Sequence, residues 1–218
     1  EARRDYLRKE YNVAVTADNL VAVKDAEIIV LAVKPQILPA VLSELNSKLK
    51  ATQLVLSIIA GATINKIADG LNHRRIIRSM PNTPAQIGEG QTVCTVTPRV
   101  SEEQKKAHAK LLGSMGVEIF AEDEKFLDMA TAISGSGPAY VFLFVESMVN
   151  AAIKLGWSPE NAYKLVMQTL MGAGLLLKQS GESPQELRHK VTSPGGTTAE
   201  AIAAFEKGGF SELVEKAV

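Results

Sequence analysis

The sequence of 218 residues lacks the features that several classes of protein require. Its 24 positive and 24 negative side chains leave no net charge, which argues against a general binder of nucleic acid or of anionic membranes. Its single cysteine, Cys94, permits no internal disulfide and fits a reducing compartment. Because Cys94 lies in an alternating, strand-like run, we predict a small buried side chain there rather than a reactive thiol.

Other signals are equally sparse. The three histidines, His73, His108 and His189, are scattered, and none has a second ligand three or four residues away. We therefore predict no metal site and expect all three side chains at the surface. The longest apolar run, residues 139–149, is broken by Glu146, which argues against a membrane span. With no signal peptide at the start of the sequence, these features predict a cytoplasmic protein.

The first half of the chain predicts an α/β domain. Apolar, non-alternating runs at residues 27–33, 54–59 and 75–79 indicate strands covered on both faces. Helical patterns at residues 37–49 and 64–71 separate them, and this rhythm predicts a parallel sheet wrapped by helices. A strand over residues 92–97, a helix over 101–115 and a strand over 117–121 complete the domain.

The loops after the predicted strands are candidate ligand contacts. In a doubly wound sheet, ligands bind outside the carboxyl ends of the strands, where residues 32–35, 59–62 and 80–84 would lie, and less certainly Asn19. For each loop alone, we favour the explanation that proline and glycine simply end a strand. For the three loops together, at equivalent strand ends, a shared ligand explains the pattern about as well as strand ending does. No glycine-rich dinucleotide turn precedes Glu27. Either this is not a dinucleotide site, or the first strand, turn and helix are absent from this chain.

The second half predicts helices alone. Two long patterns, residues 138–155 and 159–178, are apolar nearly all round, and a helix of that kind must be buried on most of its faces. The short helices that follow cannot cover both, so we expect this half to form the core of an oligomer. We place the domain boundary between residues 122 and 123.

Residues 191–200, with the sequence VTSPGGTTAE, predict a tight loop that opens a helix over residues 199–206. Thr197 or Thr198 is expected to cap this helix, and Glu200 stands at the capping-box distance from Thr197. A glycine loop that leads into a helix N-terminus is suited to hold a small anion. A well-capped helix start without a ligand is the equally weighted alternative.

Four stretches, in the same order along the chain, resemble the pyrroline-5-carboxylate reductase family. They are AVKPQ at residues 32–36, MPNTP at 80–84, SGSGPAY at 134–140 and VTSPGGTT at 191–198. The resemblance covers essentially the whole chain. It implies a Rossmann-type domain, a helical dimerisation domain and an NADPH- or NADH-dependent reduction of 1-pyrroline-5-carboxylate to L-proline. It also implies a homo-oligomer, at least a dimer and often a decamer, and an N-terminal strand and glycine-rich turn that this chain lacks.

The resemblance also assigns site residues. Thr198 would sit against the imine nitrogen of the substrate, with Ser193 lining the pocket. The substrate carboxylate would accept hydrogen bonds from the backbone N–H groups of Gly196, Thr197 and Thr198, with Val191, Gly195 and Glu124 as further substrate contacts. Lys190 stands where a cofactor phosphate would come near. The cofactor would be held by Asn19, Ala32, Val33, Lys34, Pro35, Ala60, Gly61, Asn82 and Thr83.

Two other functions compete with this one. A β-hydroxyacid dehydrogenase shares the same two-domain plan and uses a lysine and an asparagine on a long helix. Asn150 and Lys154 stand in the wrong order and spacing for that class, and the proline-glycine loop would be unexplained. A non-catalytic dimeric ligand-binding protein would account for the missing glycine turn.

Overall fold

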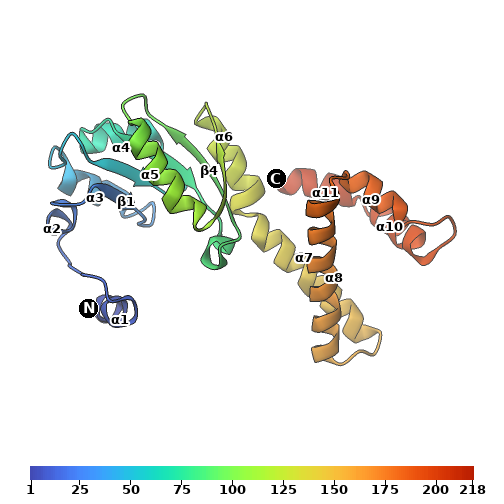
Figure 1. Cartoon of the computed structure of the whole chain (residues 1–218). Helices are drawn as coiled ribbons and strands as arrows, with labels where there is room; N and C mark the ends of the chain where they lie inside the picture. Colours follow the sequence, from blue (N-terminus) through green and yellow to red (C-terminus); the bar gives the residue numbers. More distant parts are fainter. The chain divides into compact units, whose positions relative to one another are not determined.

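The computed structural model describes residues 1–218 and divides into two compact units, Glu1–Pro138 and Ala139–Val218 (Figure 1). The first unit contains the sheet. The second contains only helices. Each unit has its own internal packing, and the fold of each follows from a different part of the sequence pattern.

The sheet of the first unit has five strands in the order β1-β2-β3-β4-β5. They are β1 (Ile28–Leu31), β2 (Leu54–Ser57), β3 (Ile76–Met80), β4 (Gly90–Val96) and β5 (Gly116–Phe120). The first three are parallel, with Leu31 opposite Ser57 and Ser57 opposite Arg78. Every residue of β2 is buried, as its unbroken apolar pattern predicts for a strand covered on both faces. The predicted α/β sheet is therefore confirmed.

One strand departs from the predicted parallel arrangement. β4 pairs with β3 in the antiparallel direction, and β5 then pairs with β4 in parallel. The reason is the connection between β3 and β4, which contains only the short 3₁₀ helix η1 (Thr83–Ile87). A parallel crossover needs a dozen or more residues, usually with an α-helix, so this short connection can only return the chain antiparallel.

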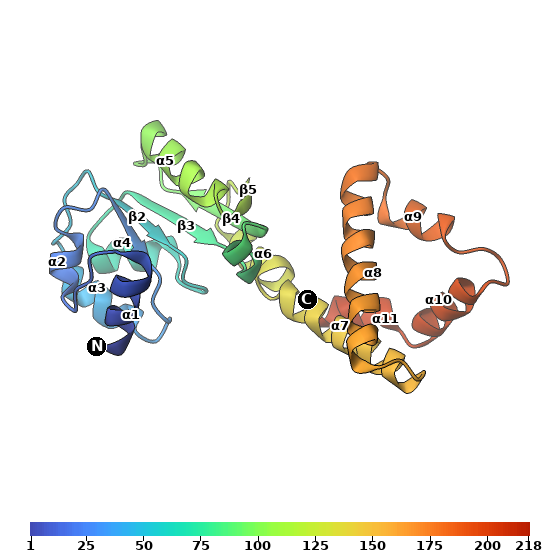
Figure 2. The same ribbon diagram turned by 60° about the horizontal axis from the view of Figure 1, so that its bottom comes forward.

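Helices cover both faces of the sheet (Figure 2). On one face, α2 (Asn19–Val23), α3 (Leu38–Leu45) and α4 (Ile64–Leu71) pack on β1 to β3. Their buried leucines and isoleucines, such as Leu38 and Ile67, are each worth about 1.5–3 kcal/mol. Next to the other face lies α5 (Glu102–Gly113), which begins with a capping box between Ser101 and Gln104. The N-terminal helix α1 (Ala2–Tyr11) buries no residue.

The histidines correct one expectation. His189 is exposed as predicted, but His73 and His108 are only 5% and 3% exposed. The Nε2 atom of His73 lies 2.8 Å from the carbonyl oxygen of Gln53, and that of His108 lies 3.0 Å from the hydroxyl of Ser79. Both rings are buried because they have these partners, which lie far away in the sequence. Cys94 is buried, as predicted.

The first unit ends in α6 (Lys125–Ala130) and a π-helical turn, η2 (Thr131–Gly135). Leu127 is fully buried and packs with Val93 and Ala121, which fixes α6 beside the sheet. This position brings Glu124 and Asp128 to Arg78 on β3, and brings Glu124 to the start of α4.

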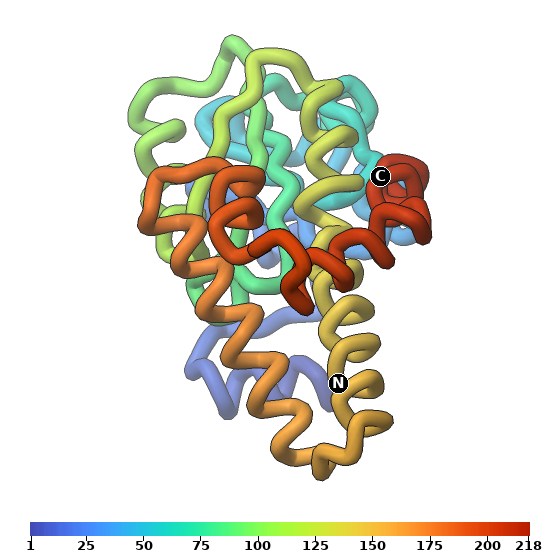
Figure 3. The backbone as a smooth tube through the Cα atoms, turned by 90° about the vertical axis from the view of Figure 1, so that its right-hand side faces the viewer, coloured from blue at the N-terminus to red at the C-terminus, as the bar shows by residue number.

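The second unit buries almost none of its side chains. Figure 3 shows the course of its helices. It consists of α7 (Gly137–Lys154), α8 (Pro159–Ser180), α9 (Pro184–Lys190), α10 (Thr197–Lys207) and α11 (Phe210–Ala217). No residue of α7 is buried, and on α8 only Ala162 and Val166 are. The rings of Phe205 and Phe210 pack edge to face, 5.5 Å apart, and join α10 to α11. The apolar faces of α7 and α8 remain open.

One helix meets the length and composition of a membrane span. It runs over Lys125–Lys154 with a mean hydropathy of 1.2, and none of its most apolar window is buried within the chain. Glu146 does not remove it from this class, contrary to our expectation. A helix that lines the interface of a soluble oligomer has the same length and composition, so this observation alone does not place the chain in a membrane.

Candidate active site

The carboxyl ends of β1, β2 and β3 meet at one edge of the sheet because the three strands are parallel neighbours. The predicted cofactor residues 32–35, 60–61 and 82–83 follow these ends directly. Ala32 and Ala60 are exposed, and Gly61 has a φ of +69° with no atom within 4 Å of where a Cβ would stand. Small side chains and open space allow an extended ligand to approach the backbone closely.

The loops are held by hydrogen bonds that leave this edge open. The N–H of Ile58 donates to the carbonyl of Leu31 over 3.1 Å, which ties the end of β2 to the end of β1. The N–H of Ile37 donates to the carbonyl of Lys34 over 2.9 Å and forms the turn before α3. Val33 packs against the core, whereas Lys34 and Pro35 are exposed.

Asn82 is tied into the fold by both ends of its side-chain amide. Its Nδ2 donates to the carbonyl of Ser134 over 3.0 Å, and its Oδ1 accepts from the N–H of Gln91 over 2.9 Å. The side chain thus fixes the end of β3 to the start of β4 and to the π-helical turn. Thr83 beside it is exposed.

The side chain of Asn19 contacts a helix in this structure. Its Nδ2 donates to Oε2 of Glu44 over 2.7 Å. Glu44 is in the last turn of α3, the helix that runs back from the end of β1 toward the start of β2. The structure therefore places the Asn19 side chain against α3. Its neighbour Asp18 caps α2 by accepting from the N–H groups of Leu20 and Val21.

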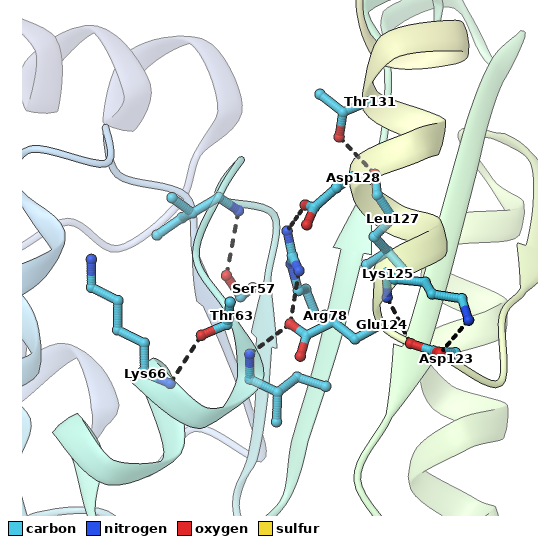
Figure 4. A network of polar contacts seen from close by, with 12 residues as sticks. Ser57, Thr63, Lys66, Arg78, Asp123, Glu124, Lys125, Leu127, Asp128 and Thr131 are labelled. Atoms are coloured by element: carbon cyan, nitrogen blue, oxygen red, sulfur yellow. Dashed lines mark hydrogen bonds and ion pairs between the residues drawn. The ribbon is translucent and has the colours of Figure 1, made fainter.

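A buried arginine that the sequence analysis missed lies beside the strand ends (Figure 4). The side chain of Arg78 on β3 is 3% exposed and donates to Oε1 of Glu124 and to Oδ1 of Asp128, each over 2.7 Å. The same Oε1 of Glu124 accepts from the N–H of Ile64 over 2.7 Å, at the start of α4. Glu124, the predicted substrate contact, is thus a bridge between β3, α4 and α6. An arginine inside an apolar strand was the signal in the sequence.

The second unit holds the predicted substrate loop. Gly195 has a φ of +70°, a left-handed conformation that favours glycine. The N–H of Gly196 donates to the carbonyl of Ser193 over 3.0 Å, which closes the turn. This N–H, predicted to bind the substrate carboxylate, therefore already has an acceptor.

The predicted threonine cap is wrong. Helix α10 begins at Thr197, its N-cap is Gly196, and no side chain caps it. The reason lies in the glycine pair, because the extended backbone of Gly196 occupies the N-cap position itself, one residue before Thr197. The N–H groups of Thr197 and Thr198 and their hydroxyls therefore have no acceptor within the chain. A helix start with free donors is an anion-binding arrangement.

The remaining loop residues surround this start. Val191 is 63% exposed, and Ser193 is also exposed. The hydroxyl of Thr192 donates to the carbonyl of Arg188 over 2.6 Å and fixes the loop to the end of α9. Lys190, predicted to stand near a cofactor phosphate, forms an ion pair with Glu182.

Family comparisons agree with this arrangement. A model described as NADP oxidoreductase, coenzyme F420-dependent, matches residues 1–61, and with the observed sheet it defines the class as oxidoreductases with a Rossmann-type domain followed by helices. A model for pyrroline-5-carboxylate reductase dimerisation matches residues 124–218. A pyrroline-5-carboxylate reductase from Synechocystis is 42% identical over 217 residues, which cover 100% of this chain and 80% of the relative. The chain therefore belongs to the pyrroline-5-carboxylate reductase family.

Solved structures give the same result. A pyrroline-5-carboxylate reductase from Coxiella burnetii is 37% identical, with a TM-score of 0.89 over 100% of this chain and 81% of its own. A pyrroline carboxylate reductase from Plasmodium falciparum, solved with NADP bound, is 37% identical, with a TM-score of 0.88 over 93% of this chain and 77% of its own. The family that four sequence stretches indicated is therefore confirmed. The unburied helices α7 and α8 lie within the match to the dimerisation model.

Proposed function

We propose that this chain reduces 1-pyrroline-5-carboxylate to L-proline, with NADPH, or NADH in its place, as the hydride donor. The observation that carries the proposal is the start of α10, where two backbone N–H groups and two hydroxyls have no acceptor in the chain. The substrate is a cyclic imine with one carboxylate, so it presents one anion and one basic nitrogen. Family membership and the NADP-bound relative support the same activity.

The substrate carboxylate binds at the N-terminus of α10. Thr197 and Thr198 donate their backbone N–H groups to it, and the helix dipole adds a favourable field. Gly196 contributes through its conformation, since its own N–H is used to close the turn with Ser193. Gly195 keeps the loop in its left-handed bend, and Val191 provides an apolar wall.

Thr198 acts at the reacting bond. Its hydroxyl hydrogen-bonds the imine nitrogen and orients it, or passes a proton to it, while Ser193 lines the same pocket. An iminium carbon accepts a hydride without a metal, so the protein mainly supplies proximity and orientation. Glu124, whose carboxylate forms an ion pair with Arg78, makes a further contact with the substrate.

The cofactor half is formed by the first unit. NADPH, when bound, supplies the hydride. Ala32, Val33, Lys34 and Pro35, together with Ala60 and Gly61, offer a backbone edge with small side chains, which fits the approach of a dinucleotide. Asn82 and Thr83 lie near its nicotinamide. Asn19 contributes only after it exchanges its hydrogen bond to Glu44.

The two parts of the chain have different roles in this proposal. We propose residues 1–122 as the cofactor-binding domain and residues 123–218 as the dimerisation and substrate-binding domain. The exposed apolar faces of α7 and α8 support a homo-oligomer that is at least a dimer, and we propose a decamer built from such dimers. We further propose that the enzyme works in the cytoplasm.

The decisive experiment follows NADPH oxidation by the full-length protein. We expect saturable NADPH oxidation with 1-pyrroline-5-carboxylate, and no reduction of NADP⁺ with a panel of 3-hydroxy acids. Turnover of a 3-hydroxy acid alone would assign the chain to the β-hydroxyacid dehydrogenases. A dimer that binds L-proline without turnover in either assay would support the non-catalytic alternative.

A further inference from the structure

A cluster of three potential metal ligands lies in the first unit, apart from the strand ends described above. It consists of Cys94 on β4, His108 on α5 and Glu118 on β5 (hereafter the Cys–His–Glu cluster), whose ligand atoms all lie within 4.8 Å of one another. The Sγ of Cys94 is 2.7 Å from Oε1 of Glu118, and Nδ1 of His108 is 3.1 Å from the same oxygen. We propose that the Cys–His–Glu cluster is a binding site for Zn²⁺.

The donor set and its spacing fit this ion. Zn²⁺ binds thiolate, imidazole and carboxylate at about 2.0–2.3 Å, so tetrahedral ligand atoms stand roughly 3.3–3.8 Å apart. The contact between Cys94 and Glu118 must therefore open by about 1 Å. Glu118 is 21% exposed and can make this movement, whereas His108 is 3% exposed and stays in place.

The surroundings supply what a metal site needs beyond its ligands. The Nε2 atom of His108 lies 3.0 Å from the hydroxyl of the buried Ser79. In the tautomer that leaves Nδ1 free to bind a metal, Nε2–H donates to this oxygen and fixes the ring. A pocket of about 250 Å³, lined by Val96, Lys105 and Phe120, opens beside the cluster. It provides access and room for a water as the fourth ligand.

The negative charge of Glu118 is not balanced by a nearby cation. Glu118 has no ammonium or guanidinium partner, since the Lys105 amine at the pocket pairs with Glu102 at 2.7 Å. A partly buried carboxylate without a cationic partner is favoured by a bound cation.

Binding is a simple exchange. The S–H bond of Cys94 breaks, its proton goes to solvent, and a Zn–S bond forms, with no change of oxidation state. The ion then joins β4, β5 and α5, so we expect it to stabilise this end of the sheet. The inference does not depend on the proposed reductase activity, because none of the three ligands has been assigned to that site.

The test uses the full-length protein after removal of metals with a chelator. Calorimetric titration with Zn²⁺ is expected to show one equivalent per chain, and Co²⁺ in its place is expected to give a thiolate-to-metal charge-transfer band. Cys94→Ser removes the thiolate with little change of volume and is expected to abolish the band and weaken Zn²⁺ binding about 100-fold or more. His108→Gln is expected to weaken it similarly.

Two further variants sharpen the outcome. Lys105→Ala changes the same pocket without removing a ligand and is expected to bind Zn²⁺ as tightly as the parent, or tighter. Ser79→Ala frees the His108 ring and is expected to weaken binding about 10- to 100-fold. The parent protein needs no substitution for the Co²⁺ spectrum, so a folding defect in a variant cannot hide the result. Absence of the band in the parent, or Zn²⁺ binding equal in the parent and Cys94→Ser, would overturn the proposal.

Discussion

Thr198 is the residue on which the proposed chemistry depends most. Thr198→Ala removes a hydroxyl that has no acceptor within the chain, so the fold loses no internal hydrogen bond. We expect kcat to fall by roughly ten- to a thousandfold, the usual range for a lost proton donor or hydrogen bond at a reacting atom. The measurement is steady-state NADPH oxidation with 1-pyrroline-5-carboxylate, together with the thermal midpoint, which should not change.

The matched control for Thr198 is Thr198→Ser. It keeps the hydroxyl and loses only a methyl group, so most of the turnover should return. Parent-like turnover in Thr198→Ala would show that the hydroxyl is not at the imine nitrogen. A loss of activity in both variants would point to packing of the side chain rather than to its hydroxyl.

Substitutions at Glu124 and Asp128 test how much each ion pair with Arg78 stabilises the fold. Glu124→Gln leaves the buried Arg78 with a neutral acceptor at one of its two sites, and we expect a loss of about 1–3 kcal/mol in the free energy of unfolding. Asp128→Asn should cost less than about 1 kcal/mol, because the Asp128 side chain is 64% exposed and solvent screens its ion pair.

Urea unfolding at one fixed protein concentration gives both values, since oligomer stability depends on concentration. Equal losses of unfolding free energy in the two variants would contradict the expectation that the less exposed ion pair, that of Glu124, contributes more to stability. A raised KM for 1-pyrroline-5-carboxylate in Glu124→Gln, with unchanged stability, would favour a direct substrate contact.

At the scale of elements, the junction of β4 and β5 depends on two facing glycines. Gly116 has a φ of +137°, and a Cβ built there would lie 2.0 Å from the carbonyl oxygen of Gly90. Gly116→Ala therefore combines a strained conformation with a backbone clash, and we expect a loss of about 3 kcal/mol or more. Gly113→Ala, three residues earlier in α5, has no atom within 4 Å of its Cβ and should gain about 0.5–1 kcal/mol. Urea unfolding of both variants is the measurement, and similar stability in the two would contradict this account.

The elements that could be predicted are those set by local pattern. The apolar runs of β2 and β3 correctly predict buried strands. The same prediction is wrong for β1, which lies at the edge of the sheet and leaves Val30 47% exposed. The direction of β4 could not be predicted from its own residues, since it depends on how short the connection from β3 is. The threonine cap of α10 was wrong because two patterns competed, and the glycine backbone took the N-cap position.

The candidate site was predictable only in part for a related reason. Gly195 and Gly196 mark the substrate loop by composition, and the loops after the parallel strands follow from the topology rule for such sheets. The position of Asn19 and the burial of His108 depend on partners distant in the sequence, namely Glu44 and Ser79. Contacts of that kind leave no periodic signal. An arginine in an apolar strand, such as Arg78, is the exception, because burial of a charge demands a partner.

At the scale of the whole molecule, the second unit is explained only by association. Its long helices expose most of their apolar side chains, including Phe142 at 65% and Leu143 at 64%. Isolated helices of this composition gain little stability without packing, so a partner must supply the missing core. The match of residues 124–218 to a dimerisation model identifies that partner as a second copy of the chain.

Leu143→Asp places a carboxylate on the exposed apolar face of α7. In a symmetric dimer each substitution occurs twice, and an unpaired charge in an apolar interface costs several kcal/mol, so we expect the dissociation constant to rise about 100-fold or more. Sedimentation velocity at micromolar concentration should show dimers or larger assemblies for the parent and monomers for the variant. Ile87→Asp, which changes an apolar residue that is 79% exposed but outside the matched region, should leave the assembly intact. A monomeric parent would refute the dimer, and dissociation by Ile87→Asp alone would move the interface to the first unit.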